Sequence, residues 1–162
     1  MKIQDISIRY ALDSDFDALS KLIGDCFAEY EGVFLDLENL DADLFALRSA
    51  YDAEGGEIWV AEKGDEMVGC IGYTPITTDE CELKRLYVPA TMRGTGLALR
   101  LVALVEQAVG GRGCTRISLW SDTRFTRAHR FYEREGYVRQ RETRDLHDIS
   151  GTTEYQFIKI LP

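Results

Sequence analysis

Hydrophobic and polar positions follow two different periods along this chain, and the periods predict an alternation of strands and helices. Apolar and polar residues alternate over Ile6–Leu12, as in a strand with one buried face. The apolar residues from Phe16 to Phe27 recur at helical spacing and predict an amphipathic helix, for which Asp13 or Ser14 is placed to cap the first amides. Leucines at helical spacing over Leu37–Tyr51 predict a second helix.

The pattern in the rest of the chain predicts a hairpin, two further helices and four single strands. The hairpin spans Glu57–Ile76 and turns tightly at Gly64 and Asp65. The helices begin near Leu97 and Thr126. The single strands are expected at 80–88, Thr115–Trp120, Tyr137–Asp145 and Thr153–Ile160. The order βααβββαβαββ predicts a mixed α/β sheet, and because no linker, repeat or low-complexity segment interrupts it, we expect one domain over residues 1–162.

Composition excludes several classes of protein. The net charge of -9 argues against nucleic-acid binding, which depends on Lys and Arg. No segment resembles a membrane span or a secretory signal, so we expect a cytoplasmic protein without a membrane partner. The cysteines are far apart and form no metal-binding pair, so we expect reduced, mostly buried thiols and no metal site. They are Cys26, Cys70, Cys81 and Cys114.

The charge is divided unevenly between the two halves of the chain. Residues 1–80 hold 19 acidic and 5 basic side chains, whereas residues 81–162 hold 9 acidic and 14 basic ones. One half could therefore favour a cation and the other an anion, although solvated surface faces would give the same count.

Two closely spaced glycines stand where the helix after the fourth strand should begin. A strand-to-helix junction presents unpaired N–H groups and the positive end of the helix dipole, which together suit a phosphate anion. Gly94 and Gly96 would let a large anion approach the main chain, and Arg93 would add charge-assisted contacts. The spacing fits neither a P-loop nor a dinucleotide fingerprint. We therefore expect a pyrophosphate site, with tight packing as the alternative explanation.

Two motifs resemble signatures of the GNAT-superfamily acetyltransferases. Arg93, Gly96 and Ala98 match the acyl-CoA-binding pattern R/Q-x-x-G-x-G/A, within "ELKRLYVPATMRGTG". The later segment "SDTRFTRAHRFYEREGY" is similar to the family's Ala-x-x-x-Tyr-Glu-x-x-Gly-Tyr/Phe pattern. The resemblance is most specific over residues 81–138, and the predicted element order agrees with it.

This resemblance implies a GNAT fold in which the fourth and fifth strands splay apart, with acetyl-CoA as cosubstrate and no metal. Pantetheine would lie in the gap against Leu86, Tyr87 and Val88. The 3′-phosphate would meet Arg124, Arg127 or Arg130. The pyrophosphate would accept hydrogen bonds from the amides of Arg93, Gly94, Thr95, Gly96, Leu97 and Ala98. Phe125 departs from the family, which often has Asn at that position in contact with pantetheine; Asp122 or Thr126 could replace that contact.

The same resemblance implies candidate catalytic residues. Tyr132 matches the tyrosine that donates a proton to the sulfur of CoA, and a phenol stays protonated at neutral pH. Glu82 is the preferred general base, and in an extended strand it shares a face with Lys84 and Leu86. Glu80 and ordered water remain alternative bases. No cysteine lies in a Cys-His pattern, so direct attack in a ternary complex is favoured over an acyl-cysteine.

The acceptor and the class of function stay open at this point. Arg139, Arg141 and Arg144 favour an acceptor that bears a carboxylate. A cationic amine is favoured instead by the acidic residues near the junction of the first two helices, which are Glu29, Glu31, Asp36 and Glu38. We expect an N-acetyltransferase that acts on a primary amine. The alternative is a non-catalytic acyl-CoA-binding sensor. A homodimer is common in the family, and the final strands could supply edges for it.

Overall fold

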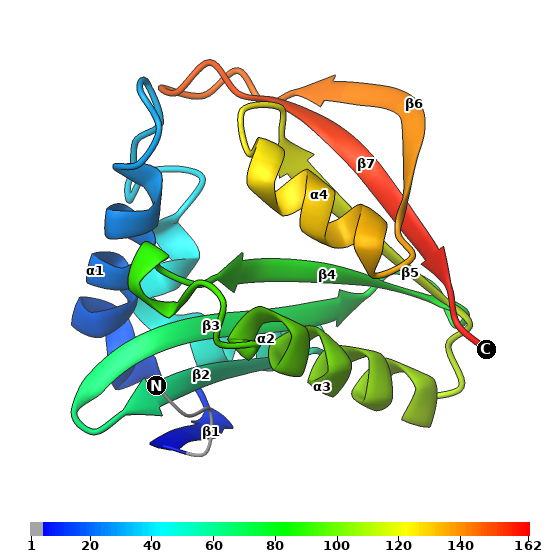
Figure 1. The fold of residues 1–162 in the computed structure, drawn as a ribbon, viewed down its shortest axis with the longest axis horizontal. Helices are drawn as coiled ribbons and strands as arrows, with labels where there is room; N and C mark the ends of the chain where they lie inside the picture. The colour runs from blue at the N-terminus through cyan, green and yellow to red at the C-terminus, as the bar shows by residue number, and fades with distance from the viewer. Residues whose placement is uncertain (1–4) are drawn as a thin grey trace.

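A seven-stranded sheet forms the centre of the protein in the computed structural model, which describes residues 5–162 (Figure 1). The strands lie in the order β1-β2-β3-β4-β5-β7-β6. All neighbouring pairs are antiparallel except β4 and β5. The strands are β1 (Ile6–Tyr10), β2 (Glu57–Lys63), β3 (Glu66–Pro75), β4 (Glu80–Tyr87), β5 (Arg116–Asp122), β6 (Val138–Asp145) and β7 (Thr153–Ile160).

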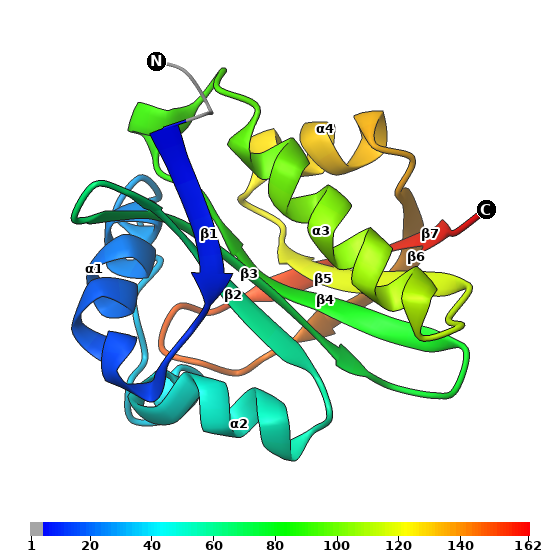
Figure 2. The ribbon, with the colours of Figure 1, turned by 90° about the horizontal axis from the view of Figure 1, so that it is seen from below.

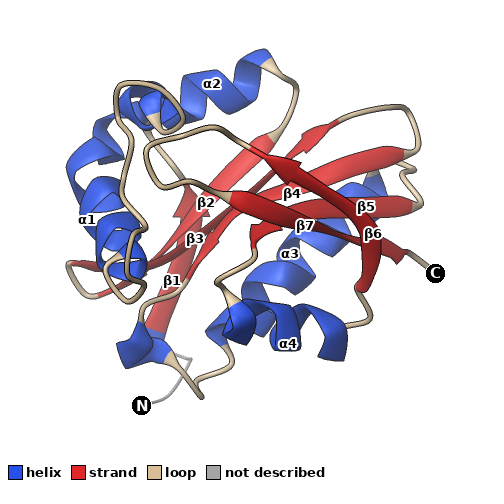
Figure 3. Ribbon diagram, turned by 90° about the horizontal axis from the view of Figure 1, so that it is seen from above, coloured by secondary structure: helices blue, strands red, loops and turns tan. Residues whose placement is uncertain are grey.

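Within the described residues, four α-helices cover the sheet, two on each face (Figure 2 and Figure 3). Figure 2 shows α1 (Phe16–Phe27) and α2 (Leu47–Ala53) on one face, and α3 (Leu97–Gly111) and α4 (Thr126–Arg134) on the other. The predicted element order βααβββαβαββ and the mixed α/β class are confirmed. Within residues 5–162, no helix has the length and apolar character needed to cross a membrane.

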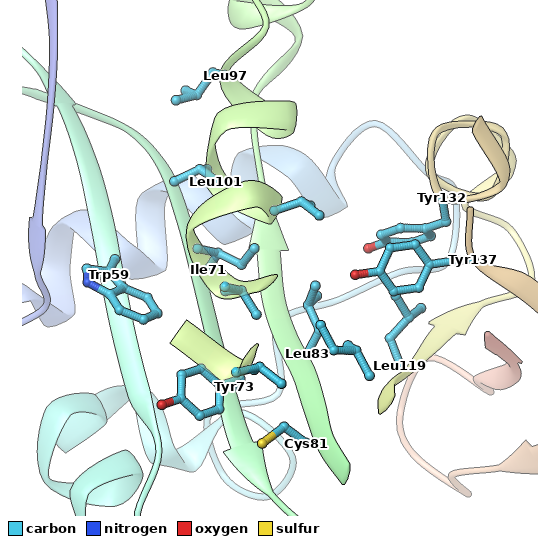
Figure 4. Close-up of a cluster of buried hydrophobic side chains, with 14 of the residues drawn as sticks. Trp59, Ile71, Tyr73, Cys81, Leu83, Leu97, Leu101, Leu119, Tyr132 and Tyr137 are labelled. Atoms are coloured by element: carbon cyan, nitrogen blue, oxygen red, sulfur yellow. The ribbon is translucent and has the colours of Figure 1, made fainter. Parts of the chain in front are cut away.

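Each face of the sheet carries its own apolar core. Buried residues of α1 and α2 such as Ile23 and Leu47 pack with Val60 and Cys70 of the sheet. On the opposite face, Leu101 and other residues of α3 belong to a second cluster, which Figure 4 shows extending to Tyr132 and Tyr137. The predicted state of the cysteines is confirmed, because all four are free and buried.

The predicted second helix begins about ten residues too early. Residues 37–41 form turns, a 3₁₀ segment follows at Ala42–Ala46, and only Leu47–Ala53 is α-helical. The cause is a local hydrogen-bond exchange, in which the Asp36 amide donates to the Asp41 carboxylate at 2.8 Å and the Asp41 amide donates to the Asp36 carbonyl. Such side-chain to backbone bonds compete with helix formation.

The predicted cap of the first helix is also absent. Asp13 to Asp15 form a 3₁₀ turn, and α1 begins at Phe16 without a hydrogen bond from a capping side chain. The Asp13 carboxylate instead accepts a hydrogen bond from the Ser49 amide at 2.9 Å. Asp13 therefore ties the start of α1 to α2, a long-range contact that local pattern could not reveal.

A β-bulge in β4 changes which side chains face the two cores. Lys84 pairs with Gly72 and Tyr87 pairs with Cys70, so two residues of β4 oppose one of β3. Arg85 within the bulge has φ of 57°. Leu86 consequently packs with the cluster around α3, whereas Tyr87 packs with the cluster around α1. The prediction that Glu82, Lys84 and Leu86 share one face is therefore wrong for Leu86.

β4 and β5 separate soon after they meet, as the family resemblance implied. Their ladder contains three residue pairs, the last of which joins Glu82 to Ser118. Beyond Glu82 the two strands diverge (Figure 1), and α4 packs beside the gap. The bulge and the end of the ladder together leave the second half of β4 open on its β5 side.

Candidate active site

A cavity of 660 Å³ occupies the gap between β4 and β5 and reaches the N-terminal end of α3. It brings together most of the residues predicted to bind or act on the acyl donor. These are Leu86, Tyr87, Val88, Arg93, Gly94, Gly96, Leu97, Ala98, Arg127 and Tyr132. The predicted residues Glu82, Thr95 and Arg124 are not part of its lining, and neither are the alternatives Glu80, Thr126 and Arg130.

The glycine-rich turn presents free backbone donors at the start of α3. Gly94 and Gly96 have φ of 76° and 82°, a conformation that side chains other than glycine rarely adopt. The amides of Gly94, Gly96 and Ala98 make no hydrogen bond to another residue of the described range 5–162. These unpaired donors, together with the helix dipole, form the kind of N-terminal site that binds a phosphate.

The remaining amides of the turn are already used inside it. The Arg93 and Thr95 amides donate to the carbonyls of Ala90 and Met92. The Thr95 hydroxyl donates to the Met92 carbonyl at 2.6 Å and accepts from the Leu97 amide at 3.3 Å. Thr95 therefore stabilises the turn, while the amides of the alternate residues Gly94, Gly96 and Ala98 stay unpaired.

Arg93 lies at this end of the cavity, and its guanidinium donates to Glu29 of the segment that follows α1. The side chain is 36% exposed. A second anion can therefore reach the guanidinium from solvent.

The three arginines considered for the 3′-phosphate lie in different surroundings. Arg127 lines the cavity. Arg124 directs its guanidinium at the Asp122 carboxylate, with donor distances of 2.9 and 2.8 Å. Arg130 is exposed on α4 and outside the cavity lining. Of the three, Arg127 is the one whose position fits a ligand in the cavity.

Tyr132 is buried in the wall of the cavity, and its ring packs on Tyr137 and Phe157. Figure 4 shows its hydroxyl pointing from α4 toward β4. That hydroxyl makes no hydrogen bond to any residue in the described range, and Tyr132 is part of the cavity lining. Burial raises the pKa of the phenol well above its usual range, so it remains protonated.

Phe125, where the family often has Asn, is part of an aromatic cluster at the cavity. Its ring lies 4.7 Å from that of Tyr30 and 6.2 Å from that of Phe27, measured between centroids. Neither suggested replacement is free to take over the polar contact, because Asp122 binds Arg124 and the exposed Thr126 lies outside the cavity lining. This chain offers an apolar surface at that position.

Glu82 lies on the α1 side of β4, with one carboxylate oxygen 3.5 Å from the Lys84 ammonium. Its side chain is 18% exposed. The alternative base, Glu80, accepts a hydrogen bond from the Ser118 hydroxyl at 3.1 Å. Glu80 is therefore engaged at the closed end of the β4–β5 ladder.

Two residues that the sequence analysis did not assign, Trp120 and Glu154, also line the cavity. Glu154 lies opposite Asp122 in the β5–β7 ladder, and its carboxylate accepts from Arg144 at 2.7 Å. Burial raises the pKa of Glu154 above its usual range. The alternating pattern of β7 predicted a strand but not its register with β5, and the register is what brings Glu154 to the cavity.

The cysteines have the properties of packing residues. Burial raises the pKa of Cys26, Cys70 and Cys81 to about 12, which disfavours the nucleophilic thiolate. Within residues 5–162, no group of His, Cys, Asp and Glu side chains is arranged to hold a metal ion.

His129 is buried between α4 and the end of β5. Its Nε2 atom lies 2.9 Å from the Asp122 carbonyl, and because a carbonyl only accepts, Nε2 carries the proton. Burial lowers the pKa of the imidazole. The structure therefore places His129 in helix packing.

His129 should make folding stability depend on pH. Because its folded pKa is lowered, the unfolded chain binds the proton more strongly, and stability present above pH about 6.5 is lost as pH falls. His129→Gln, which can keep the donor to Asp122, should cost about 1 kcal/mol at pH 7.5. Urea unfolding of His129→Gln at pH 7.5 and 5.5 should show a smaller loss of unfolding free energy between the two pH values than the wild type shows. His147→Gln, at an exposed position, should behave like the wild type; equal losses in all three proteins would contradict the assignment.

Comparison with known proteins places this arrangement in a family. Residues 16–137 match the family described as "Acetyltransferase (GNAT) family". The uncharacterized N-acetyltransferase YjgM of Escherichia coli is 32% identical over 128 residues, which cover 76% of each chain. An acetyltransferase structure from Streptococcus agalactiae superposes with a TM-score of 0.84 at 23% identity, covering 98% of this chain and 99% of that one. A GNAT acetyltransferase from Elizabethkingia anophelis with acetyl-CoA bound superposes with a TM-score of 0.64 at 15% identity, covering 97% and 99%. The chain therefore belongs to the acetyltransferase (GNAT) family of enzymes.

Proposed function

We propose that this protein transfers the acetyl group of acetyl-CoA to a primary amine by direct attack in a ternary complex. One observation carries the proposal. The same cavity is lined by the residues with free amides at the start of α3 and by Tyr132, whose hydroxyl has no hydrogen-bond partner in the described residues. A phosphate-bearing thioester donor fits these two features together. The acetyl-CoA bound to the Elizabethkingia anophelis relative of the same fold supports this choice of donor.

The two ends of the cavity suit the two ends of the donor. The amides of Gly94, Gly96 and Ala98, with Arg93 and Arg127, would bind the phosphates. The edge of β4 beyond Glu82 has no strand partner on its β5 side, so its backbone groups at Leu86–Val88 could pair with the pantetheine arm as with an added strand.

Proton transfers would take place in the cavity between these two ends. Attack of the neutral amine forms the N–C bond and breaks the C–S bond, and the departing thiolate takes the proton of the Tyr132 hydroxyl. Glu82 would accept the amine's proton, directly or through water. A backbone N–H near Val88 would polarise the thioester carbonyl. The buried thiols, with their raised pKa, give no support to an acyl-cysteine intermediate.

The proposal is tested by measuring CoA release with a thiol reagent. The purified protein is incubated with acetyl-CoA and a panel of amines, amino acids and short peptides, and thermal stability is measured with CoA alone. Turnover with amine acceptors, and mass addition of one acetyl group to the product, would support the proposal. Stabilisation by CoA without turnover over the panel would favour a sensor. Absence of both would overturn the donor assignment.

The role of Glu82 predicts a pH-dependent defect. Glu82→Gln should lower kcat/KM about tenfold at pH 6–7, where most of the amine is protonated and a base is needed. The defect should shrink toward pH 9, as more amine becomes neutral in solution. The test is to measure kcat/KM of the wild type and of Glu82→Gln from pH 6 to 9. A loss that is the same at every pH, or no loss, would show that Glu82 is not the general base.

A further inference from the structure

Resting on the proposed function, we propose that the acceptor is a free α-amino acid or a closely similar small zwitterion, held through its carboxylate by Arg144. Its amino group would lie beside Glu154 in the cavity. The sequence leaves two acceptors open, a polycation and a molecule with a carboxylate. The contacts of the acidic residues and of Arg144 favour the second.

Two of the acidic residues that suggested a polycationic acceptor, Glu29 and Asp36, are already engaged within the protein. Glu29 binds the guanidinium of Arg93. Asp36 is buried, and its backbone amide and carbonyl exchange hydrogen bonds with Asp41. The surrounding carboxylates Asp41 and Asp43 both bind Arg85, at 2.6 and 2.7 Å. Glu31 and Glu38 stay exposed, so two separate carboxylates remain for a polycation rather than a continuous acidic cluster.

Of the three arginines that suggested a carboxylate, only Arg144 lies beside the cavity. Arg144 is opposite Glu154 in the β6–β7 ladder, and its guanidinium carbon lies 4.4 Å from the centre of the Trp120 ring. Both Trp120 and Glu154 line the cavity. Arg139 stacks instead on Tyr155, whose ring packs against His129 of α4 on the opposite face of the sheet.

The guanidinium of Arg144 has hydrogen-bond donors without a partner in the described residues. Its Nε donates to Glu154 at 2.7 Å, and its two terminal nitrogens make no hydrogen bond to another residue of the described chain. The side chain is 43% exposed, whereas Glu154 is 14% exposed. Stacked on Trp120 and fixed at Nε, the outer edge of the guanidinium presents the planar fork that binds a carboxylate in two hydrogen bonds.

Glu154 supplies the complementary charge further inside. Its carboxylate is held by Arg144 on one side and faces the cavity that also contains Tyr132. A carboxylate there attracts the ammonium group of an acceptor and directs the amine toward the thioester. An acceptor with one positive and one negative group a few bonds apart matches this pair, while a diamine would place a cation against Arg144.

The surroundings restrict the acceptor to a small molecule. Above this end of the sheet, the loop after α1 meets the loop between β6 and β7, where the Ser150 hydroxyl accepts from the Phe34 amide at 2.8 Å (Figure 1). Arg124 joins the same loops through the Gly32 carbonyl and the Thr152 hydroxyl, each at 3.4 Å. These contacts join the loop after α1 to the loop between β6 and β7, and we expect the joined loops to hinder the approach of a lysine on a folded protein.

Matched acceptors test the carboxylate contact directly. The set consists of the twenty amino acids, their methyl esters and the corresponding decarboxylated amines, all assayed for CoA release with the wild type. At least one amino acid should have a kcat/KM ten or more times that of its own ester and amine. In Arg144→Gln, its KM should rise about tenfold with little change in kcat, and the ester should be used as by the wild type. Arg141→Gln, on the same strand with an exposed side chain, should leave all values unchanged.

The outcomes separate this inference from the proposed function. If amines or esters are acetylated as well as the acids, or if Arg144→Gln lowers the rates of acids and esters equally, the carboxylate contact is wrong while the amine acetyltransferase stands. If no member of the set or of the wider panel is acetylated, the proposed function itself fails. A peptide used in strong preference to every amino acid would also overturn the inference.

Discussion

Gly96→Asp is expected to weaken the binding of coenzyme A at least 100-fold, about 2.7 kcal/mol, while the protein still folds. Gly96 precedes α3 with φ of 82°, and its own amide and those of Gly94 and Ala98 make no hydrogen bond to another residue of the described range. A carboxylate here would occupy the space in front of those amides and would repel a pyrophosphate. Aspartate tolerates positive φ better than most residues, so the loss of stability should stay near 1 kcal/mol.

Gly110→Asp is the matched control for that result. Gly110 lies near the other end of the same helix, where an added Cβ atom would have no atom of another element within 4 Å. The same charge is then added to the same helix, far from the glycine-rich turn. Calorimetric titration with CoA should give a dissociation constant within about twofold of the wild type for this variant. Similar affinities for both variants would show that the start of α3 does not bind the phosphates.

Local sequence pattern predicts much of the fold. It also predicts the glycine-rich turn at the proposed donor end of the site. The hairpin of β2 and β3 turns at Gly64 and Asp65 as predicted, because its signal lies in adjacent residues. The glycines of the turn before α3 likewise indicate their own conformation, since positive φ has a direct sequence signature. These elements need no information from distant parts of the chain.

The acceptor end of the site depends on register and on long-range pairing, which no local pattern contains. The bulge at Arg85 is stabilised by carboxylates some forty positions earlier, and it turns Leu86 to the opposite face. Glu154 reaches the cavity because β7 inserts between β5 and β6 in one particular register. A shift of one residue would direct Glu154 to the other face of the sheet. Local sequence pattern therefore indicates more residues of the proposed donor site than of the proposed acceptor site.

Tyr132→Phe is expected to lower kcat about 10² to 10³-fold, with the affinity for CoA within twofold of the wild type. The variant removes one hydroxyl that makes no hydrogen bond in the described structure, so the melting temperature should stay the same or rise. Because burial raises the pKa of this phenol, deprotonation of Tyr132 should not limit the wild-type rate at any pH up to 10. Single-turnover measurements of CoA release separate this chemical step from product dissociation.

Tyr137→Phe makes the comparison decisive, because the two tyrosines belong to one aromatic stack. Their ring centroids lie 5.9 Å apart, but the Tyr137 hydroxyl donates to Glu106 at 3.1 Å and is not part of the cavity lining. Losing that bond should cost about 1 kcal/mol of stability with kcat unchanged. Tyr132→Phe should therefore lower kcat without lowering stability, whereas Tyr137→Phe should lower stability without lowering kcat. A loss of kcat in Tyr137→Phe as large as in Tyr132→Phe would mean that the stack acts on the reaction only through its packing, and Tyr132 would then lose the role of proton donor.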